Sequence, residues 1–173
     1  MLQPTTTKEE LTGHNVLKTE PSDGPRLQIG DWSLHWKAQG KDTGYSFSIF
    51  ETTLAPGVGI PLHKHPYPEF FYVLHGRVDF CRWNDEGVSE WLSCVAGERV
   101  LAPSNAPHTF HNKSTEPARV LSVSTYHHER MLKDAVNPGG NLNYLPPQLT
   151  PEEFERLFKS MEANQVYVVA EHP

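Results

Sequence analysis

The chain has 173 residues, a formal net charge of −6 with histidine counted as neutral, ten histidines and two cysteines. This length suits one domain with a sizeable core, and the acidic balance (sequence pI about 5.9) argues against nucleic acid as a partner. No apolar run is long enough to span a bilayer, so no membrane partner is expected. The first residues lack an apolar signal core, and two cysteines are too few for a disulfide framework, which favours a reducing, cytoplasmic setting.

The chain begins with an arm and two strand patterns. Residues 1–26 are polar, with glycine and proline punctuation, and predict an extended N-terminal arm that packs on the domain or on a second subunit. Residues 28–36 and 45–54 then alternate apolar and polar side chains, which is typical of strands. We expect one apolar set of each strand to share a face: Trp32, Leu34 and Trp36 in the first, and Tyr45, Phe47 and Ile49 in the second.

A stretch over residues 57–76 carries three metal-binding side chains within seven residues, His63, His65 and Glu69. Successive side chains of a strand point to opposite faces, so the two histidines share a face, and Glu69 has the same parity. Mixed imidazole and carboxylate ligation suits iron, manganese, cobalt, nickel, copper or zinc. The histidine pair alone is weak evidence, because surface histidines two residues apart are common.

Further short strands are predicted over 77–83, 89–95, 99–102 and 118–126, separated by polar or glycine-containing turns. Many short strands with frequent turns indicate an all-β sandwich or barrel. Cys81 and Cys94 fall in two of these strands, either as neighbours or as separate half-buried, reduced thiols.

A second stretch, residues 97–112, offers His108 as a fourth ligand. By strand alternation, His108 points inward with Phe110 and Asn112, whereas His111 points outward and is not expected to bind metal. In a small closed barrel the far wall can supply such a ligand. Four other histidines are interpreted as ordinary polar residues: His14, His127, His128 and His172.

The C-terminal part, residues 129–173, is predicted to be a loop plus a helix packed on the barrel. A short helical turn at 129–133 and a proline- and glycine-rich loop at 134–148 precede a helix at 150–163, which begins with a capping box. Residues 166–170 could add an edge strand. The apolar face of the helix either packs on the outside of the barrel or forms a lid or a dimer contact: Phe154, Leu157, Phe158 and Met161.

The two ligand stretches resemble the motifs of the cupin superfamily. Its first motif is Gly, five residues, His-x-His, three or four residues, Glu, six residues, Gly; its second is Gly, five residues, Pro-x-Gly, two residues, His, three residues, Asn. This sequence supplies Gly57, His63, His65, Glu69 and Gly76 for the first motif, and Gly97, Pro103, His108 and Asn112 for the second. Asn105 replaces the motif glycine, and asparagine tolerates a positive φ better than other non-glycine residues. The resemblance covers about residues 28–126.

The resemblance implies a single cupin barrel (a double-stranded β-helix, or jelly roll) over residues 27–128 with a C-terminal α-helix. It also implies one divalent transition metal per chain (Fe, Ni, Mn, Co, Cu or Zn), held by His63, His65, Glu69 and His108. A homodimer is expected on the same ground.

Among cupins the chain is most similar to quercetinase-type dioxygenases, which implies a small aromatic or enolisable substrate, dioxygen as second reactant, and Glu69 as both ligand and catalytic base. Two alternatives stay open: a non-oxidative metal-dependent enzyme (isomerase, cyclase, lyase or decarboxylase), and a cupin that binds a small molecule without turnover. Five apolar residues have a parity that could place them at the pocket, with plain core packing as the alternative for each: Phe47, Ile49, Phe71, Val73 and Phe110.

Overall fold

The computed structural model describes residues 16–29, 32–83, 86–135 and 150–169. The strands in chain order are β1 (Arg26–Ile29), β2 (Trp32–Ala38), β3 (Phe47–Leu54), β4 (His63–Lys64), β5 (Glu69–His75), β6 (Arg77–Trp83), β7 (Ser89–Val95), β8 (Arg99–Ala102), β9 (Thr109–His111), β10 (Ala118–Thr125) and β11 (Tyr167–Val168). The α-helices of the described residues are α1 (Tyr126–Ala135) and α2 (Pro151–Ala163), and a 3-10 turn covers Gly40–Thr43.

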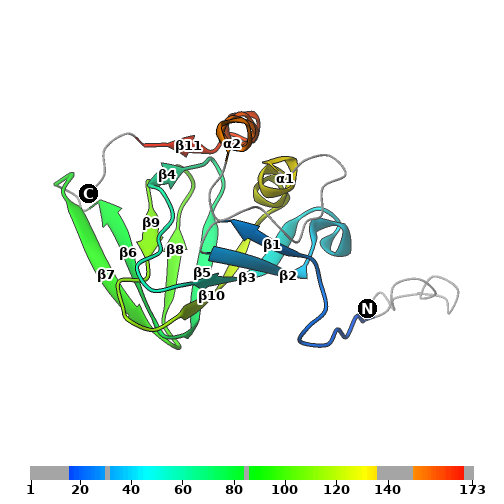
Figure 1. The fold of residues 1–173 in the computed structure, drawn as a ribbon, viewed down its shortest axis with the longest axis horizontal. Coiled ribbons are helices and arrows are strands. Elements are labelled where there is room, and N and C mark those ends of the chain that lie inside the picture. The colour runs from blue at the N-terminus through cyan, green and yellow to red at the C-terminus, as the bar shows by residue number, and fades with distance from the viewer. Residues whose placement is uncertain (1–15, 30–31, 84–85, 136–149, 170–173) are drawn as a thin grey trace, which may run out of the picture.

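The strands pair into antiparallel sheets. One sheet has six strands in the order β1-β2-β3-β10-β5-β8, a second has three in the order β7-β6-β9, and β11 pairs with β4. Figure 1 shows β6 and β7 at one side, β1 to β3 at the other, and α2 at the top beside β11. The prediction of an all-β fold of antiparallel strands with a C-terminal helix is therefore confirmed.

The two ligand stretches pair with each other across the barrel. Isolated bridges join His63 to His108 and Gly59 to His111. The first bridge consists of two backbone hydrogen bonds, one in each direction, at 3.1 and 2.9 Å. Since this pairing links residues more than forty positions apart in the sequence, it depends on closure of the barrel.

The predicted inward face of β3 is wrong. Phe47 is 41% exposed, and the buried residues have the opposite parity, among them Phe50 at 3% and Leu54 at 0%. Both faces of this strand carry large apolar side chains, so alternation alone does not choose between them. The buried face is set by the neighbours, because Phe50 packs in one core cluster with the side chains of β1, β2 and α1. In place of the single strand expected over 28–36 there are two antiparallel strands, β1 and β2. Leu34 and Trp36 are buried, and Trp32 is half-buried.

Two apolar clusters fill the fold. The first joins β1, β2 and β3 to α1 and the chain after α2: Leu27, Ile29, Leu34, Trp36, Phe50, Tyr67, Met131, Leu132 and Val166. The second lies between the two larger sheets: Leu54, Phe71, Val73, Val78, Phe80, Cys94, Ala102, Phe110, Ala118 and Val120. Cys81 and Cys94 are buried free thiols on the paired strands β6 and β7, and burial raises the pKa of both.

The C-terminal helix begins as predicted. The Thr150 hydroxyl accepts from the Glu153 amide at 3.2 Å, and the Glu153 carboxylate accepts from the Thr150 amide at 2.8 Å, which completes the capping box. The helix packs on α1, where the Ser160 hydroxyl donates to the Met131 carbonyl at 2.6 Å. Helix α1 is longer than the predicted turn, and the predicted edge strand is the two-residue β11.

Part of the predicted arm, residues 1–15, and nearly all of the predicted loop, residues 136–148, lie outside the described residues. Where described, residues 16–25 have no regular secondary structure and are largely exposed. In the described part of the chain, no helix combines the length and apolarity that crossing a membrane requires. The homodimer and the cytoplasmic setting stay predictions.

Candidate metal centre

The structure brings the four predicted ligands together. One ligand atom from each of His63, His65, Glu69 and His108 lies within 4.8 Å of the others, and all four residues are buried. His63 is on β4 with His65 just after it, Glu69 begins β5, and His108 immediately precedes β9. The bridge between His63 and His108 sets the distance between the two walls of the cluster.

Hydrogen bonds orient the three imidazoles in the same way. Nδ1 of His63 donates to the Pro61 carbonyl at 2.8 Å, Nδ1 of His65 to the Tyr67 carbonyl at 2.7 Å, and Nδ1 of His108 to the Ala106 carbonyl at 2.9 Å. A carbonyl oxygen only accepts, so Nδ1 carries a proton in each ring, and in the neutral form Nε2 is left with its lone pair. A backbone carbonyl on the second ring nitrogen is the usual support for a metal-binding histidine.

Glu69 lies at the centre of the cluster. Its Oε2 is 3.3 Å from Nε2 of His65 and 3.8 Å from Nε2 of His108. Burial by itself raises the pKa of Glu69, but the surrounding imidazoles, with His128 the strongest, hold it well below its usual range. Burial lowers the pKa of His63 to about 3, and His108 adds to this shift. A deprotonated Glu69 and a neutral His63 are in the protonation states that a metal requires of such ligands.

The donor set fits a divalent transition metal. Nε2 of His108 is buried and has no hydrogen-bond partner, although buried polar atoms in proteins are nearly always paired. Three converging imidazole nitrogens and one carboxylate oxygen form a mixed site that suits first-row metals. A metal ion at this point would satisfy the unpaired nitrogen. His111 is not in this cluster, as predicted, and its ring lies edge-on to Trp91 on the three-stranded sheet.

His128, interpreted as an ordinary polar residue, is outside the ligand cluster but is buried beside it. This residue is 8% exposed, and its Nδ1 lies 3.6 Å from Glu69 Oε2 without a hydrogen-bond partner. It comes from α1, which follows the last strand of the barrel and turns its apolar side toward the site. A sequence signal was available, since His128, Met131, Leu132 and Ala135 have the i, i+3, i+4, i+7 spacing of one helix face. The expected turn at 129–133 was too short to include it.

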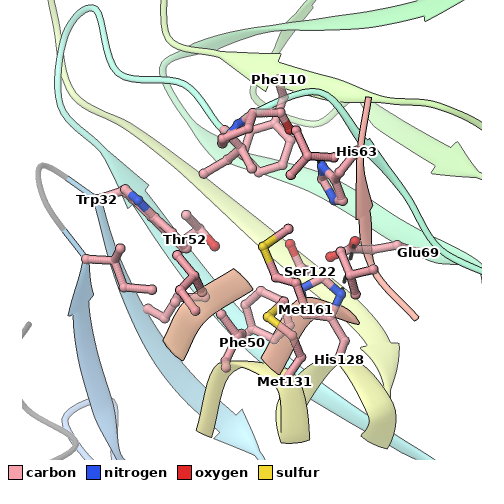
Figure 2. A pocket seen from close by; sticks show the side chains of 18 of the residues that line it. Trp32, Phe50, Thr52, His63, Glu69, Phe110, Ser122, His128, Met131 and Met161 are labelled. Carbon is pink, nitrogen blue, oxygen red and sulfur yellow. Dashed lines mark hydrogen bonds and ion pairs between the residues drawn. The ribbon is translucent and has the colours of Figure 1, made fainter. Parts of the chain in front are cut away.

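A cavity of about 170 Å³ opens onto the cluster, between the barrel and the two helices. Figure 2 shows Glu69 and His128 at one side of the cavity, joined by a dashed line, with Ser122 nearby and Trp32 and Phe50 on the opposite walls. The lining comes from the barrel, from both helices and from β11: Ile29, Trp32, Leu34, Phe50, Thr52, Ile60, Pro61, His63, Glu69, Phe110, Ser122, His128, Met131, Leu132, Phe154, Leu157, Phe158, Met161, Val166 and Val168.

Of the five residues whose parity indicated the pocket, Phe110 lines it. Phe71 and Val73 belong to the core between the sheets, as the alternative interpretation had it. Phe47 and Ile49 lie on the outer face of β3, because the inward parity of that strand is the opposite one. The four apolar residues of α2 all line the cavity, so this helix covers it. Leu157 and Met161 also pack against the first apolar cluster, and the dimer contact stays a prediction.

Comparison with known proteins agrees with this geometry. Residues 50–124 match the family model described as a cupin domain, and no curated protein matches the sequence. Among solved structures, the polyketide cyclase RemF from Streptomyces resistomycificus is similar (20% identity, 65% of this chain and 80% of that chain, TM-score 0.55). So is oxalate decarboxylase from Bacillus subtilis (21% identity, 60% of this chain and 27% of that chain, TM-score 0.53).

A third similar structure is described as a sugar phosphate isomerase of the cupin superfamily from Silicibacter pomeroyi (23% identity, 63% of this chain and 75% of that chain, TM-score 0.51). At these identities the likeness establishes the fold alone. The family match, the two motifs and the jelly-roll topology agree: residues 50–124 form a cupin domain, and the chain has the fold of the cupin superfamily.

Proposed function

We propose that this protein is a metal-dependent enzyme that acts on a small organic molecule in the apolar cavity. One divalent transition metal (Fe, Ni, Mn, Co, Cu or Zn) is held by His63, His65, Glu69 and His108. The observation that carries the proposal is the convergence of three Nε2 atoms and a buried carboxylate at the wall of a cavity, with one of these nitrogens left unpaired. When bound, the metal supplies Lewis-acid chemistry and, if it is redox-active, reaction with dioxygen.

The chain's own residues have distinct roles in this proposal. The backbone carbonyls hold the imidazole rings in one tautomer, and the apolar lining excludes water from the reacting groups. Glu69 faces the cavity as well as the ligand cluster, so it can take a proton from a substrate hydroxyl or enolisable C–H. This assigns Glu69 as both ligand and catalytic base.

For the reaction class we propose a dioxygenase of quercetinase type, acting on an aromatic or enolisable substrate. The second candidate is a non-oxidative cupin enzyme such as an isomerase, cyclase, lyase or decarboxylase. It is supported by the similarity to a polyketide cyclase, which covers most of both chains. The third candidate, a cupin that binds its ligand without turnover, is disfavoured because burying the ligand set without a metal would be costly.

Metal content of the purified protein, measured by mass spectrometry, is the first test. We expect about one metal per chain, lost in the His63→Ala/His108→Ala double variant and kept in the control His75→Ala, an exposed histidine on the strand of Glu69. One redox-capable metal, followed by oxygen uptake with enolisable aromatics of one ring, supports the dioxygenase. One zinc, with no uptake after exchange to iron or nickel, supports the non-oxidative enzyme. No metal, even after reconstitution, contradicts both and leaves the binding protein.

A further inference from the structure

The cavity next to the ligand cluster has a consistent chemistry. Among the described residues no lysine or arginine lines it, and the one Lys or Arg outside the described residues is Lys8. The polar side chains of the lining are Thr52, His63, Glu69, Ser122 and His128. An anionic group placed away from the metal would have no lysine or arginine to pair with, and burying an unpaired charge is strongly unfavourable.

The size of the cavity limits what fits inside it. Its volume is about 170 Å³, and an engineered apolar cavity of about 150 Å³ accommodates one benzene molecule. The enclosed part therefore holds one substituted ring, or an aliphatic molecule of similar volume. A flavonol, with a fused bicycle and a further phenyl ring, exceeds it unless α2 moves.

Two buried polar atoms in the lining make no hydrogen bond within the protein. Ser122, on β10, is 1% exposed, and its hydroxyl makes no hydrogen bond. His128 Nδ1, on α1, is also unpaired and lies 3.6 Å from Glu69 Oε2. Figure 2 shows both side chains in the cavity beside Glu69. Buried polar atoms in proteins nearly always have a partner, so these two indicate a hydrogen-bonding group of the ligand at this end of the cavity.

We propose that the cavity selects an uncharged molecule of the size of one ring that carries two neighbouring polar groups. One of its oxygens faces the ligand cluster, and the second polar group is hydrogen-bonded by Ser122 and His128. The inference rests on the proposed function, because it takes the metal centre as the site of the first oxygen. Ser122 and His128 are binding and positioning residues here, and the remaining walls select by shape.

The test is calorimetric titration of the zinc-loaded protein with three compounds that share a 3-hydroxy-4-pyranone head. Maltol is a single uncharged ring, comenic acid adds a carboxylate, and 3-hydroxyflavone adds the extra rings. We expect maltol to bind at least about tenfold more tightly than the other two. Comenic acid would bury an unpaired carboxylate, which is enough for a factor of this size, and 3-hydroxyflavone exceeds the cavity. Equal or tighter binding of 3-hydroxyflavone or comenic acid overturns the inference.

Ser122→Ala should weaken the binding of maltol by about five- to tenfold, the effect of one hydrogen bond. The control is Ser124→Ala: Ser124 is also buried on β10 and its hydroxyl is also unpaired, but it does not line the cavity. Equal effects of the two substitutions contradict the role of Ser122.

Zinc content measured on the same samples separates this inference from the proposed function. Zinc retained without the expected preference for maltol overturns the inference alone, and absence of zinc overturns the metal site. In that second case, phenol and flavone titrated into the metal-free protein still test the cavity. Tighter binding of phenol, weakened by Ser122→Ala, supports the size and polar-anchor assignment, and tighter binding of flavone overturns it.

Discussion

Asn112, the last position of the second motif, links separate segments of the barrel and is not part of the ligand cluster. Its side chain is fully buried. Its Nδ2 donates to the carbonyls of Leu54 and Ala55, at 3.1 and 3.2 Å, and to the Glu116 carbonyl at 2.7 Å. Its Oδ1 accepts from the amide and the hydroxyl of Ser114, at 3.1 and 2.6 Å. One side chain thus joins the end of β3 to the turn before β10.

Asn112→Ala removes all of these bonds and leaves buried carbonyls without a donor. A net value of about 1 kcal/mol for each bond, with the two shared carbonyl contacts counted as one, predicts a loss of roughly 4 kcal/mol in the free energy of unfolding. For a chain of this length that corresponds to a fall in Tm of about 8 to 16 °C. Asn112→Asp should cost more despite its shape, because a carboxylate oxygen would face three carbonyl oxygens.

Urea denaturation followed by circular dichroism measures the effect, with an unchanged m-value as the check that both variants unfold from the same folded state. Ser114→Ala is the matched control and should cost about 1 to 2 kcal/mol, because it removes the hydroxyl bonds alone. A loss below about 1 kcal/mol for Asn112→Ala, or a milder effect of Asn112→Asp, would refute the reasoning.

Three further outcomes follow from the structure. Removal of metal by a chelator should lower Tm. The free energy of unfolding that bound metal adds grows with the free metal concentration and reaches about 4 kcal/mol at a thousand times Kd. A Tm that is independent of added metal contradicts the site. Asn105→Ala should lower the free energy of unfolding by roughly 1 to 2 kcal/mol, because the residue has φ 64°, whereas Asn105→Gly should be nearly neutral; urea denaturation that ranks them equally contradicts this. Thr150→Ala should lower the free energy of unfolding by about 1 kcal/mol, because α2 loses its N-terminal cap. The control Thr115→Ala, at an exposed threonine, should be nearly neutral in the same assay. Equal losses in the two variants contradict the capping role.

Local patterns predicted the hairpin strands well. The predicted ranges 77–83, 89–95 and 99–102 are the observed bounds of β6, β7 and β8. Each is a short apolar or β-branched run between turn residues, so the information lies within the segment itself. The cap of α2 was predictable for the same reason, because its hydrogen bonds join residues three positions apart.

The ligand cluster was predictable from spacing, but only in two steps. Strand parity puts His63, His65 and Glu69 on one side, which depends on local geometry. His108 joins them through the bridge to His63, and this long-range pairing was available from the motif resemblance and not from periodicity. Asn105 shows how a departure from the motif is tolerated: it adopts the positive φ of the glycine it replaces, and its amide donates to the His65 carbonyl at 2.7 Å.

The inward face of β3 could not be read from the strand alone. Alternation defines two faces, and each face of this strand has large apolar side chains. The neighbouring elements decide which face is buried. The Phe50 ring lies against Trp36 of β2 and His128 of α1, with centroid distances of 6.4 and 5.7 Å. That contact requires the position of a helix that begins 76 residues later in the chain.

The cavity explains why substrate identity does not follow from the family. The cupin match ends at residue 124 and contains all four ligands. A large share of the cavity wall lies beyond that point, in α1, α2 and β11, including His128 and the apolar roof. The four candidate ligands thus lie inside the matched range, whereas the cavity wall comes partly from this range and partly from the segments before and after it. Substrate selection therefore has to be tested both within the matched range, at Ser122, and beyond it, at His128 and the apolar residues of α2.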